Sequence, residues 1–170
     1  MQPEFDEQDR RGLQLVHRLR AISVELELSR AAFARAHGLH DTDVRALIHL
    51  LDADRAGVPA TAGWLGAQLG LTSPSTTALI DRLERAGHVV RARSSADRRK
   101  VEIRVSDRAV ALGWEFFGPL LTRMVRAMRS FGAADLDTVD RFLSEVADAV
   151  GGPPAGPGTG TSGRPPPPSR

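Results

Sequence analysis

The chain has 170 residues, of which 41% are hydrophobic and 26% are charged, and this composition predicts one globular domain of ordinary size together with a tail. It contains no cysteine, which excludes disulfide bonds, thiolate metal sites and cysteine nucleophiles. The net charge is only +2, but residues 82–108 carry nine basic and four acidic groups, a local excess that is typical of a surface that binds an anion such as nucleic acid.

Three helices are predicted before residue 71: one over about residues 6–36, one from Asp41 to a break at residues 57–59, and one from Thr61 to Gly70. The first helix carries an apolar stripe at three- and four-residue steps, formed by Leu15, Leu19, Ile22 and Leu26. The apolar face of the second helix is formed by Val44, Leu47, Ile48 and Leu51. Such stripes predict that both helices pack against other apolar surface.

A fourth helix is predicted to run to Ala86, and Gly87 closes it. Either Thr72 or Ser73 caps its start, because a hydroxyl followed directly by Pro74 is typical of the first turn of a helix. The inner face of this helix is mainly apolar, with Thr76, Leu79, Ile80, Leu83 and Ala86. The outer face is small and polar, with Pro74, Thr77, Ala78, Asp81 and Arg85, while Ser75 and Arg82 lie on its flank.

Two short strands are predicted next, over residues 88–93 and 100–105, joined by a polar, arginine-rich turn at residues 94–99. Ser106 is expected to cap a fifth helix, and a last helix spans about residues 134–150. Several large residues of the fifth helix either line a ligand pocket or belong to a core or dimer interface: Trp114, Phe116, Phe117, Met124 and Met128. Residues 151–170 are rich in Gly and Pro and lack an apolar pattern, which predicts a disordered tail.

This order of elements predicts a mainly α fold, a winged helix-turn-helix with a two-stranded β-hairpin as its wing. The fourth helix has a small outer face, so it is able to lie deep in the major groove of DNA, where its hydroxyls reach base edges or phosphates. The guanidinium groups of the hairpin tip suit a narrow minor groove, whose electrostatic potential is strongly negative.

The helix-turn-helix region contains two characteristic stretches, WLGAQLGL at residues 64–71 and TTALIDRLERAGHVVR at residues 76–91. The tripeptide Asp97-Arg98-Arg99 follows them in the hairpin tip. In these motifs and in the order of its helices, the chain resembles the MarR (multiple antibiotic resistance regulator) family of bacterial transcription factors over about residues 8–150.

The resemblance implies a homodimer that binds a pseudo-palindromic operator in double-stranded DNA. Helices from both termini, at residues 1–36 and 106–150, would form the dimerisation region, and residues 37–105 would form the DNA-binding domain. It also implies a transcription regulator, usually a repressor, whose DNA affinity is modulated by a small aromatic or phenolic effector bound between the two regions.

The resemblance further implies which residues contact DNA. The family's wing arginine enters the minor groove, a role that maps to Arg99, with Arg98 as a second contact and Asp97 steadying the loop. The contact positions of the recognition helix map to Ser73, Ser75, Thr76 and Thr77. Ala78 departs from the family, because many members carry a polar or basic residue there. We therefore expect few direct hydrogen bonds from this helix to base edges.

Three charged residues of the fourth helix allow two interpretations each. Arg82 and Arg85 either contact phosphates or lie on a solvated helix face. Asp81 either accepts a hydrogen bond from a cytosine amine or holds a neighbouring arginine such as Arg82, Arg85 or one in the wing. The structural role of Asp81 is favoured, since a carboxylate close to phosphates is repelled.

Other functions receive no support from the sequence. It contains no catalytic constellation, so we expect no enzyme and no cofactor, and His37, His40 and Asp41 lack a fourth ligand for a metal site. No apolar run approaches 18 residues and the N-terminus lacks a signal-peptide core, which predicts a cytoplasmic protein without membrane partners. The remaining alternative is a winged helix that binds another protein without specific DNA binding, and the positive charge of residues 82–108 favours DNA over it.

Overall fold

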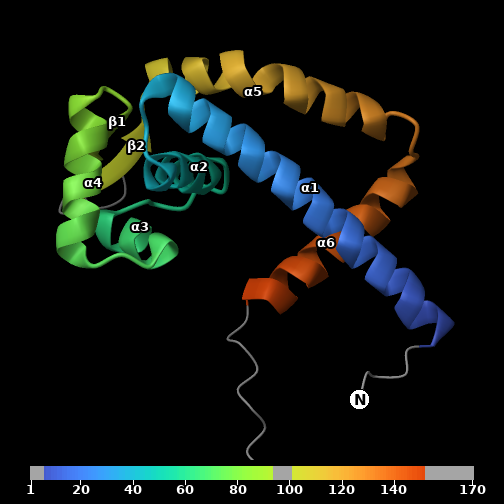
Figure 1. Cartoon of the computed structure of the whole chain (residues 1–170). Helices are drawn as coiled ribbons and strands as arrows, with labels where there is room; N and C mark the ends of the chain where they lie inside the picture. The colour runs from blue at the N-terminus through green and yellow to red at the C-terminus, as the bar shows by residue number, and fades with distance from the viewer. Residues whose placement is uncertain (1–5, 94–100, 152–170) are drawn as a thin grey trace, which may run out of the picture. The chain divides into compact units, whose positions relative to one another are not determined.

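A computed structural model describes residues 6–93 and 101–151 of the chain, which forms two compact units, Met1–Pro119 and Leu120–Arg170. The described residues confirm the predicted fold class, since they are mainly helical and contain a single two-stranded hairpin. The elements in chain order are α1 (Glu7–His37), α2 (Asp41–Arg55), α3 (Ala62–Leu69), α4 (Ser73–Arg85), β1 (Val89–Arg93), β2 (Val101–Val105), α5 (Asp107–Met128) and α6 (Ala133–Gly151) (Figure 1).

The long helix α1 has a reciprocal cap at its start and a glycine at its end. The Asp6 carboxylate accepts a hydrogen bond from the Asp9 N–H at 2.8 Å, and the Asp9 carboxylate accepts one from the Asp6 N–H at 3.2 Å. Gly38 ends the helix at φ 63°, a left-handed conformation that glycine adopts without steric cost.

Helix α2 begins differently from the prediction. Asp41, the predicted cap, is the first helical residue, and His40 occupies the N-cap position. The Asp43 carboxylate reaches back one turn and accepts a hydrogen bond from the His40 N–H at 3.0 Å. A side chain inside the first turn thus accepts the hydrogen bond of a backbone N–H that has no partner within the helix at the start of α2.

The caps of α3 and α4 shape the helix-turn-helix. Thr61 caps α3 as predicted, because its hydroxyl accepts a hydrogen bond from the Trp64 N–H at 3.2 Å. Gly70 ends α3 at φ 66°. Thr72, rather than Ser73, caps α4, which settles the choice that the sequence left open.

Helices α3 and α4 cross with almost no space between them. A Cβ atom added to Gly66 of α3 would lie 2.7 Å from the hydroxyl oxygen of Thr76 on α4 and 3.4 Å from the Leu71 carbonyl oxygen. Only a glycine permits this approach, so the close crossing depends on the residue type at position 66.

The hairpin is antiparallel, with Val89 opposite Val105 and Arg91 opposite Ile103. Strand β2 also makes a hydrogen bond outside the hairpin, since the Ile103 N–H donates to the Ala60 carbonyl at 2.8 Å. The chain just before α3 therefore joins the wing to the helix-turn-helix.

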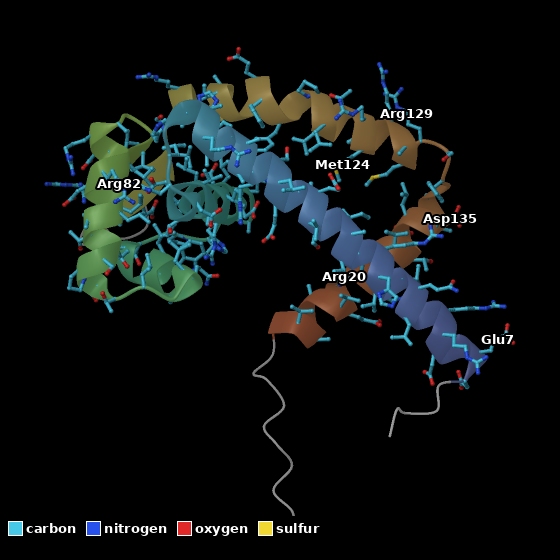
Figure 2. All side chains as sticks on the ribbon, in the orientation of Figure 1. Glu7, Arg20, Arg82, Met124, Arg129 and Asp135 are labelled. Carbon is cyan, nitrogen blue, oxygen red and sulfur yellow. The ribbon has the colours of Figure 1, made fainter. Side chains whose placement is uncertain are left out.

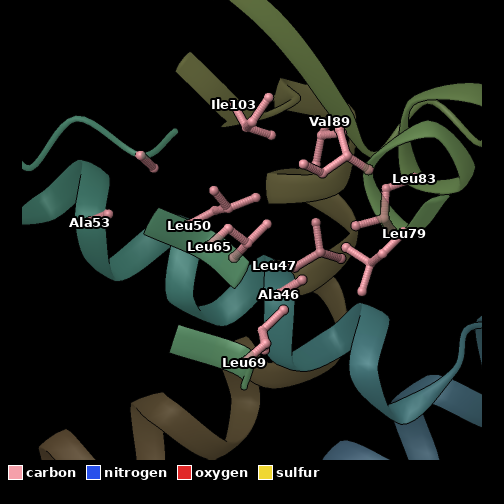
Figure 3. Close-up of a cluster of buried hydrophobic side chains, with 12 residues drawn as sticks. Ala46, Leu47, Leu50, Ala53, Leu65, Leu69, Leu79, Leu83, Val89 and Ile103 are labelled. Atoms are coloured by element: carbon pink, nitrogen blue, oxygen red, sulfur yellow. The ribbon is translucent and has the colours of Figure 1, made fainter. Parts of the chain in front are cut away.

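A cluster of buried aliphatic side chains holds α2, α3, α4 and the hairpin together (Figure 3). Leu65, Ile80 and Leu83 are at most 1% exposed, and each buried side chain of this size contributes about 1.5–3 kcal/mol to folding. The cluster consists of Ala46, Leu47, Leu50, Ala53, Ala60, Leu65, Leu69, Leu79, Ile80, Leu83, Val89 and Ile103. Ile48, predicted on the apolar face of α2, is instead 41% exposed. The buried face of α2 contains Leu47 and Leu50, and Ile48 lies outside it.

A second, aromatic cluster joins the end of α1 to α5. The ring of Phe33 lies 5.2 Å from that of Phe116 and 5.0 Å from that of Phe117, measured between centroids, and Val44 of α2 packs with them. The core interpretation of Phe116 and Phe117 is therefore confirmed.

Apolar side chains remain exposed on helices of both units. On α1, Leu15, Ile22 and Leu26 are 41–51% exposed. In the second unit, Leu136, Val139 and Leu143 are exposed along α6. None of the helices in the described ranges combines the length and the apolar character that crossing a membrane requires.

Candidate nucleic-acid interface

The outer face of α4 is exposed and small. Ser73, Ser75, Thr77 and Ala78 all lie on it with exposed side chains, while the opposite face is buried in the aliphatic cluster. The first turn is well ordered by its cap, because the Thr72 hydroxyl accepts the Ser75 N–H and lies 2.9 Å from the Ser75 hydroxyl oxygen. This face is therefore a sterically undemanding surface with hydroxyls at one end.

Thr76 does not belong to this surface, and its prediction as a DNA contact is wrong. Its side chain is 2% exposed, and its hydroxyl donates a hydrogen bond to the Thr72 carbonyl at 2.9 Å. The hydroxyl also lies at the close crossing with Gly66 of α3. The helical period turns position 76 inward with Leu79 and Ile80.

Arg82 forms an ion pair with a buried carboxylate, and its predicted contact with DNA stays a prediction. Its guanidinium extends from α4 (Figure 2) and donates to the two carboxylate oxygens of Asp43 on α2, at 2.6 and 3.3 Å. The Asp43 side chain is 2% exposed and that of Arg82 is 41% exposed. A bidentate pair with a buried carboxylate compensates the arginine charge and ties α4 to the start of α2.

Asp81 has the structural role that the sequence favoured. Its carboxylate accepts a hydrogen bond from Arg91 of β1 at 2.5 Å, and Arg91 also pairs with Glu84 of α4. The arginine that Asp81 holds therefore belongs to the wing strand. The two carboxylates of α4 and Arg91 link the helix to the first strand of the wing.

Ion pairing reduces the positive charge that the basic segment offers to a partner. Arg82, Arg91 and Arg104 of residues 82–108 each pair with a carboxylate. Within the part of the chain that the structure describes, three arginines of the segment form no ion pair: Arg85, Arg93 and Arg108. Arg85 extends from the last turn of α4 and Arg93 ends β1, so both are exposed near the surface of α4 and the wing.

The predicted wing contacts Asp97, Arg98 and Arg99 lie outside the described residues. The structure does describe the two strands that lead to them, β1 up to Arg93 and β2 from Val101. The roles of these three residues stay predictions.

A recess of about 340 Å³ lies beside the turn between α4 and β1. It is lined by His37 of α1, His88 of the turn, and Arg108, Ala111, Leu112 and Glu115 of α5. His88 is 8% exposed, and its Nδ1 atom has no hydrogen-bond partner among the described residues. Burial lowers the pKa of His88, and the charge of Arg108 lowers it further, against an opposing effect of Asp43.

Nothing in the described ranges forms a metal centre, since no three His, Asp or Glu side chains lie close enough together to hold an ion. The recess beside His88 was not anticipated from the sequence. Its residues come from three separated segments, and no local pattern connects them.

Comparisons with known proteins agree with this geometry. A family model described as MarR family matches residues 37–100. An uncharacterised HTH-type transcriptional regulator of Bacillus subtilis, YcgE, is 34% identical over 135 residues, which cover 79% of this chain and 85% of YcgE.

Solved structures of similar fold include a MarR family protein from Bacillus stearothermophilus, with 23% identity, a TM-score of 0.58, and coverage of 86% of this chain and 99% of that one. The S. aureus protein MepR is also similar. Its complex with DNA matches with 16% identity and a TM-score of 0.50 over 77% of this chain and 96% of MepR. MepR bound to ethidium bromide matches with 18% identity and a TM-score of 0.51 over 79% of this chain and 95% of MepR.

Proposed function

Because the chain belongs to the MarR family of transcriptional regulators, we propose that it is a repressor that binds a pseudo-palindromic operator as a homodimer and releases it when a small ligand binds. Its relatives are DNA-binding regulators and not enzymes. Binding to chromosomal DNA would place it in the bacterial cytoplasm. The observation that carries the proposal is the exposed, small and hydroxyl-bearing outer face of α4.

The proposed DNA contacts come from α4 and the wing. Ser73, Ser75 and Thr77 face the major groove, where their hydroxyls meet base edges and phosphates. Arg85 and Arg93 are exposed and outside any ion pair of the described residues, so both are available to neutralise phosphates. At the wing tip, Arg99 enters the minor groove, with Arg98 beside it and Asp97 supporting the loop.

The proposed homodimer assigns a role to the exposed apolar side chains. Residues 1–36 and 106–150 form its dimerisation region and residues 37–105 its DNA-binding domain. Leu15, Ile22 and Leu26 on α1, and the exposed leucines and valines on α6, are the kind of surface that an obligate dimer buries.

The proposed ligand response rests on analogy and on one structural feature. MepR has been solved with ethidium bromide, which shows that a protein of this fold accommodates a planar aromatic ligand. In the present chain the recess beside His88 lies next to the end of α4, so a ligand there would act close to the DNA-binding surface.

Selection of bound sequences from a random pool of duplex DNA tests the DNA-binding function. We expect a preferred operator with two half-sites about 10 base pairs apart, and an affinity that falls steeply as salt rises. The competing function, a winged helix that binds another protein through an apolar surface, predicts no enriched sequence and little salt dependence. That outcome would overturn the proposal.

A further inference from the structure

Asp81 lies on the face of α4 that is proposed to enter the major groove. It follows Thr77 by four positions and Ala78 by three, so the helical period places it next to both on the outer face. Its side chain is 47% exposed. A partner that approaches Thr77 and Ala78 therefore also meets the carboxylate of Asp81.

Only one oxygen of this carboxylate is used within the described part of the chain. Arg91 donates from Nη2 to the Oδ1 atom of Asp81 at 2.5 Å, and no described residue donates a hydrogen bond to Oδ2. The other arm of the same guanidinium pairs with Glu84, one turn further along α4. Arg91 belongs to β1, where it lies opposite Ile103 in the hairpin. The wing strand therefore holds the Asp81 carboxylate by Oδ1 and leaves Oδ2 as an open acceptor.

The charges around Asp81 make a phosphate an unfavourable neighbour for it. Asp81 and Glu84 carry two negative charges, and the single guanidinium of Arg91 compensates one of them. Arg85 is exposed and forms no ion pair with either carboxylate. Since like charges repel, the open oxygen suits a hydrogen-bond donor on a base edge and not the DNA backbone.

The donors that DNA presents in the major groove are the amines of cytosine and adenine. Adenine places the N7 acceptor beside its amine, and the lone pair of N7 would repel a carboxylate. Cytosine presents its N4 amine without an acceptor on the same base. An open carboxylate oxygen therefore distinguishes cytosine from the other three bases.

We propose that Asp81 determines part of the operator sequence, because its Oδ2 atom accepts a hydrogen bond from the N4 amine of one cytosine in each half-site. The proposal rests on the function proposed above, DNA binding through α4, and deepens it by naming a base that the operator contains. The pair with Arg91 and the contact with cytosine use different oxygens, so one residue holds the wing strand and reads a base.

The experiment uses the full-length protein and the operator selected from random duplex DNA. Each cytosine of the half-sites is replaced in turn by N4-methylcytosine, which still pairs with guanine but lacks the amine hydrogen that faces the major groove. Fluorescence anisotropy gives the dissociation constant. We expect one cytosine per half-site at which the replacement weakens wild-type binding about tenfold or more, because a hydrogen bond to a charged group is lost.

Two variants assign this cytosine to Asp81. In Asp81→Ala the same replacement should change the affinity by less than about twofold, because the acceptor is gone and the two changes remove one interaction. Glu84→Gln is the matched control, since Glu84 is the other carboxylate that Arg91 holds. In this variant the loss on N4-methylation should equal that of the wild type.

The variant Asp81→Asn gives a second readout. Arg91 is a donor, so it keeps the amide oxygen of the asparagine on its own side, and the NH2 group faces the base. Selection from the random pool should then replace the cytosine at this position by a base with an acceptor in the major groove, such as guanine.

The wild-type selection separates this proposal from the function on which it rests. If an operator is enriched but none of its cytosines responds to N4-methylation, Asp81 only holds Arg91 and the base contact is refuted, while the regulator function stands. The same conclusion follows if the loss persists in Asp81→Ala, because the methyl group then acts through another residue. If the wild type enriches no operator, the proposed function itself has failed.

Discussion

At the scale of single residues, two arginines three positions apart on α4 have different roles. Arg82 is held by the buried carboxylate of Asp43, whereas Arg85 is exposed and has no ion pair within the described residues. The sequence does not distinguish them, because Asp43 lies 39 residues before Arg82 and only the folded chain brings the two together.

The two arginines should respond differently to replacement by methionine. Arg82→Met leaves the Asp43 carboxylate buried and unpaired, so it should lower the free energy of unfolding by on the order of 3 kcal/mol, with the salt dependence of DNA binding unchanged. Arg85→Met should preserve stability and lower the salt slope by about one unit per protomer. Urea unfolding and fluorescence anisotropy at several salt concentrations measure both. An equal loss of slope in the two variants would identify Arg82 as a phosphate contact after all.

His88 should make stability depend on pH. Its pKa is lowered in the folded protein, mainly by burial, so the unfolded chain binds this proton more readily than the folded one. The stabilisation is complete above the ordinary histidine pKa of about 6.5 and is lost as the pH falls through the folded-state value. Urea unfolding between pH 7.5 and 5 should show this loss in the wild type and in His17→Gln, an exposed control, but less of it in His88→Gln. If the free energy of unfolding falls equally with pH in all three proteins, His88 is not the source of the pH dependence.

At the scale of elements, the helix-turn-helix depends on the close crossing of α3 and α4. Gly66→Ala brings a methyl group to 2.7 Å from the Thr76 hydroxyl, and we expect a destabilisation of about 1–3 kcal/mol. A Cβ atom added to Gly63, also in α3, would meet nothing within 4 Å, so Gly63→Ala should be neutral or stabilising by up to about 1 kcal/mol. Thermal unfolding of both variants gives the comparison, and equal melting temperatures would show that the crossing relaxes freely.

The elements themselves were largely predictable because their ends have local signals. Thr61 caps the start of α3 through its hydroxyl, and Gly70 and Gly87 follow helix ends with a positive φ, so each of these signals depends on a single residue. The predicted start of α2 was wrong because its cap comes from Asp43, inside the helix, rather than from a residue in front of it. The helical period of α4 predicts that Thr76 points inward, whereas the resemblance to a family predicts that it contacts DNA. In the structure Thr76 is buried, as the helical period predicts.

Contacts between elements were less predictable. The ion pairs of Arg91 with Asp81 and Glu84, the hydrogen bond from Ile103 to Ala60, and the recess beside His88 join residues from separate segments. The chain has 23 lysines and arginines and 21 aspartates and glutamates, and sequence alone does not tell which of them form pairs. The basic excess of residues 82–108 therefore overstated the charge that remains free for DNA.

At the scale of the whole molecule, the exposed apolar residues of α1 predict assembly. We expect a dimer in solution, and the double variant Ile22→Asp with Leu26→Asp should be monomeric, because both side chains are exposed in the single chain and the change would bury charges in the interface. Ile48→Asp is the control, since Ile48 is as exposed as Leu26 but lies on α2. Sedimentation or light scattering gives the mass. A wild-type monomer at micromolar concentration would contradict the dimer.

The most direct test of the DNA-binding surface is the dissociation constant of Ala78→Glu for the selected operator. Ala78 is exposed in the middle of the outer face of α4, so a glutamate there would meet phosphates and base edges without disturbing the core. We predict an affinity loss of about a hundredfold or more at an unchanged melting temperature, since like-charge contacts cost several kcal/mol, and no loss for Ala36→Glu, an exposed position on α1. Wild-type affinity in Ala78→Glu would show that this face of α4 does not contact DNA.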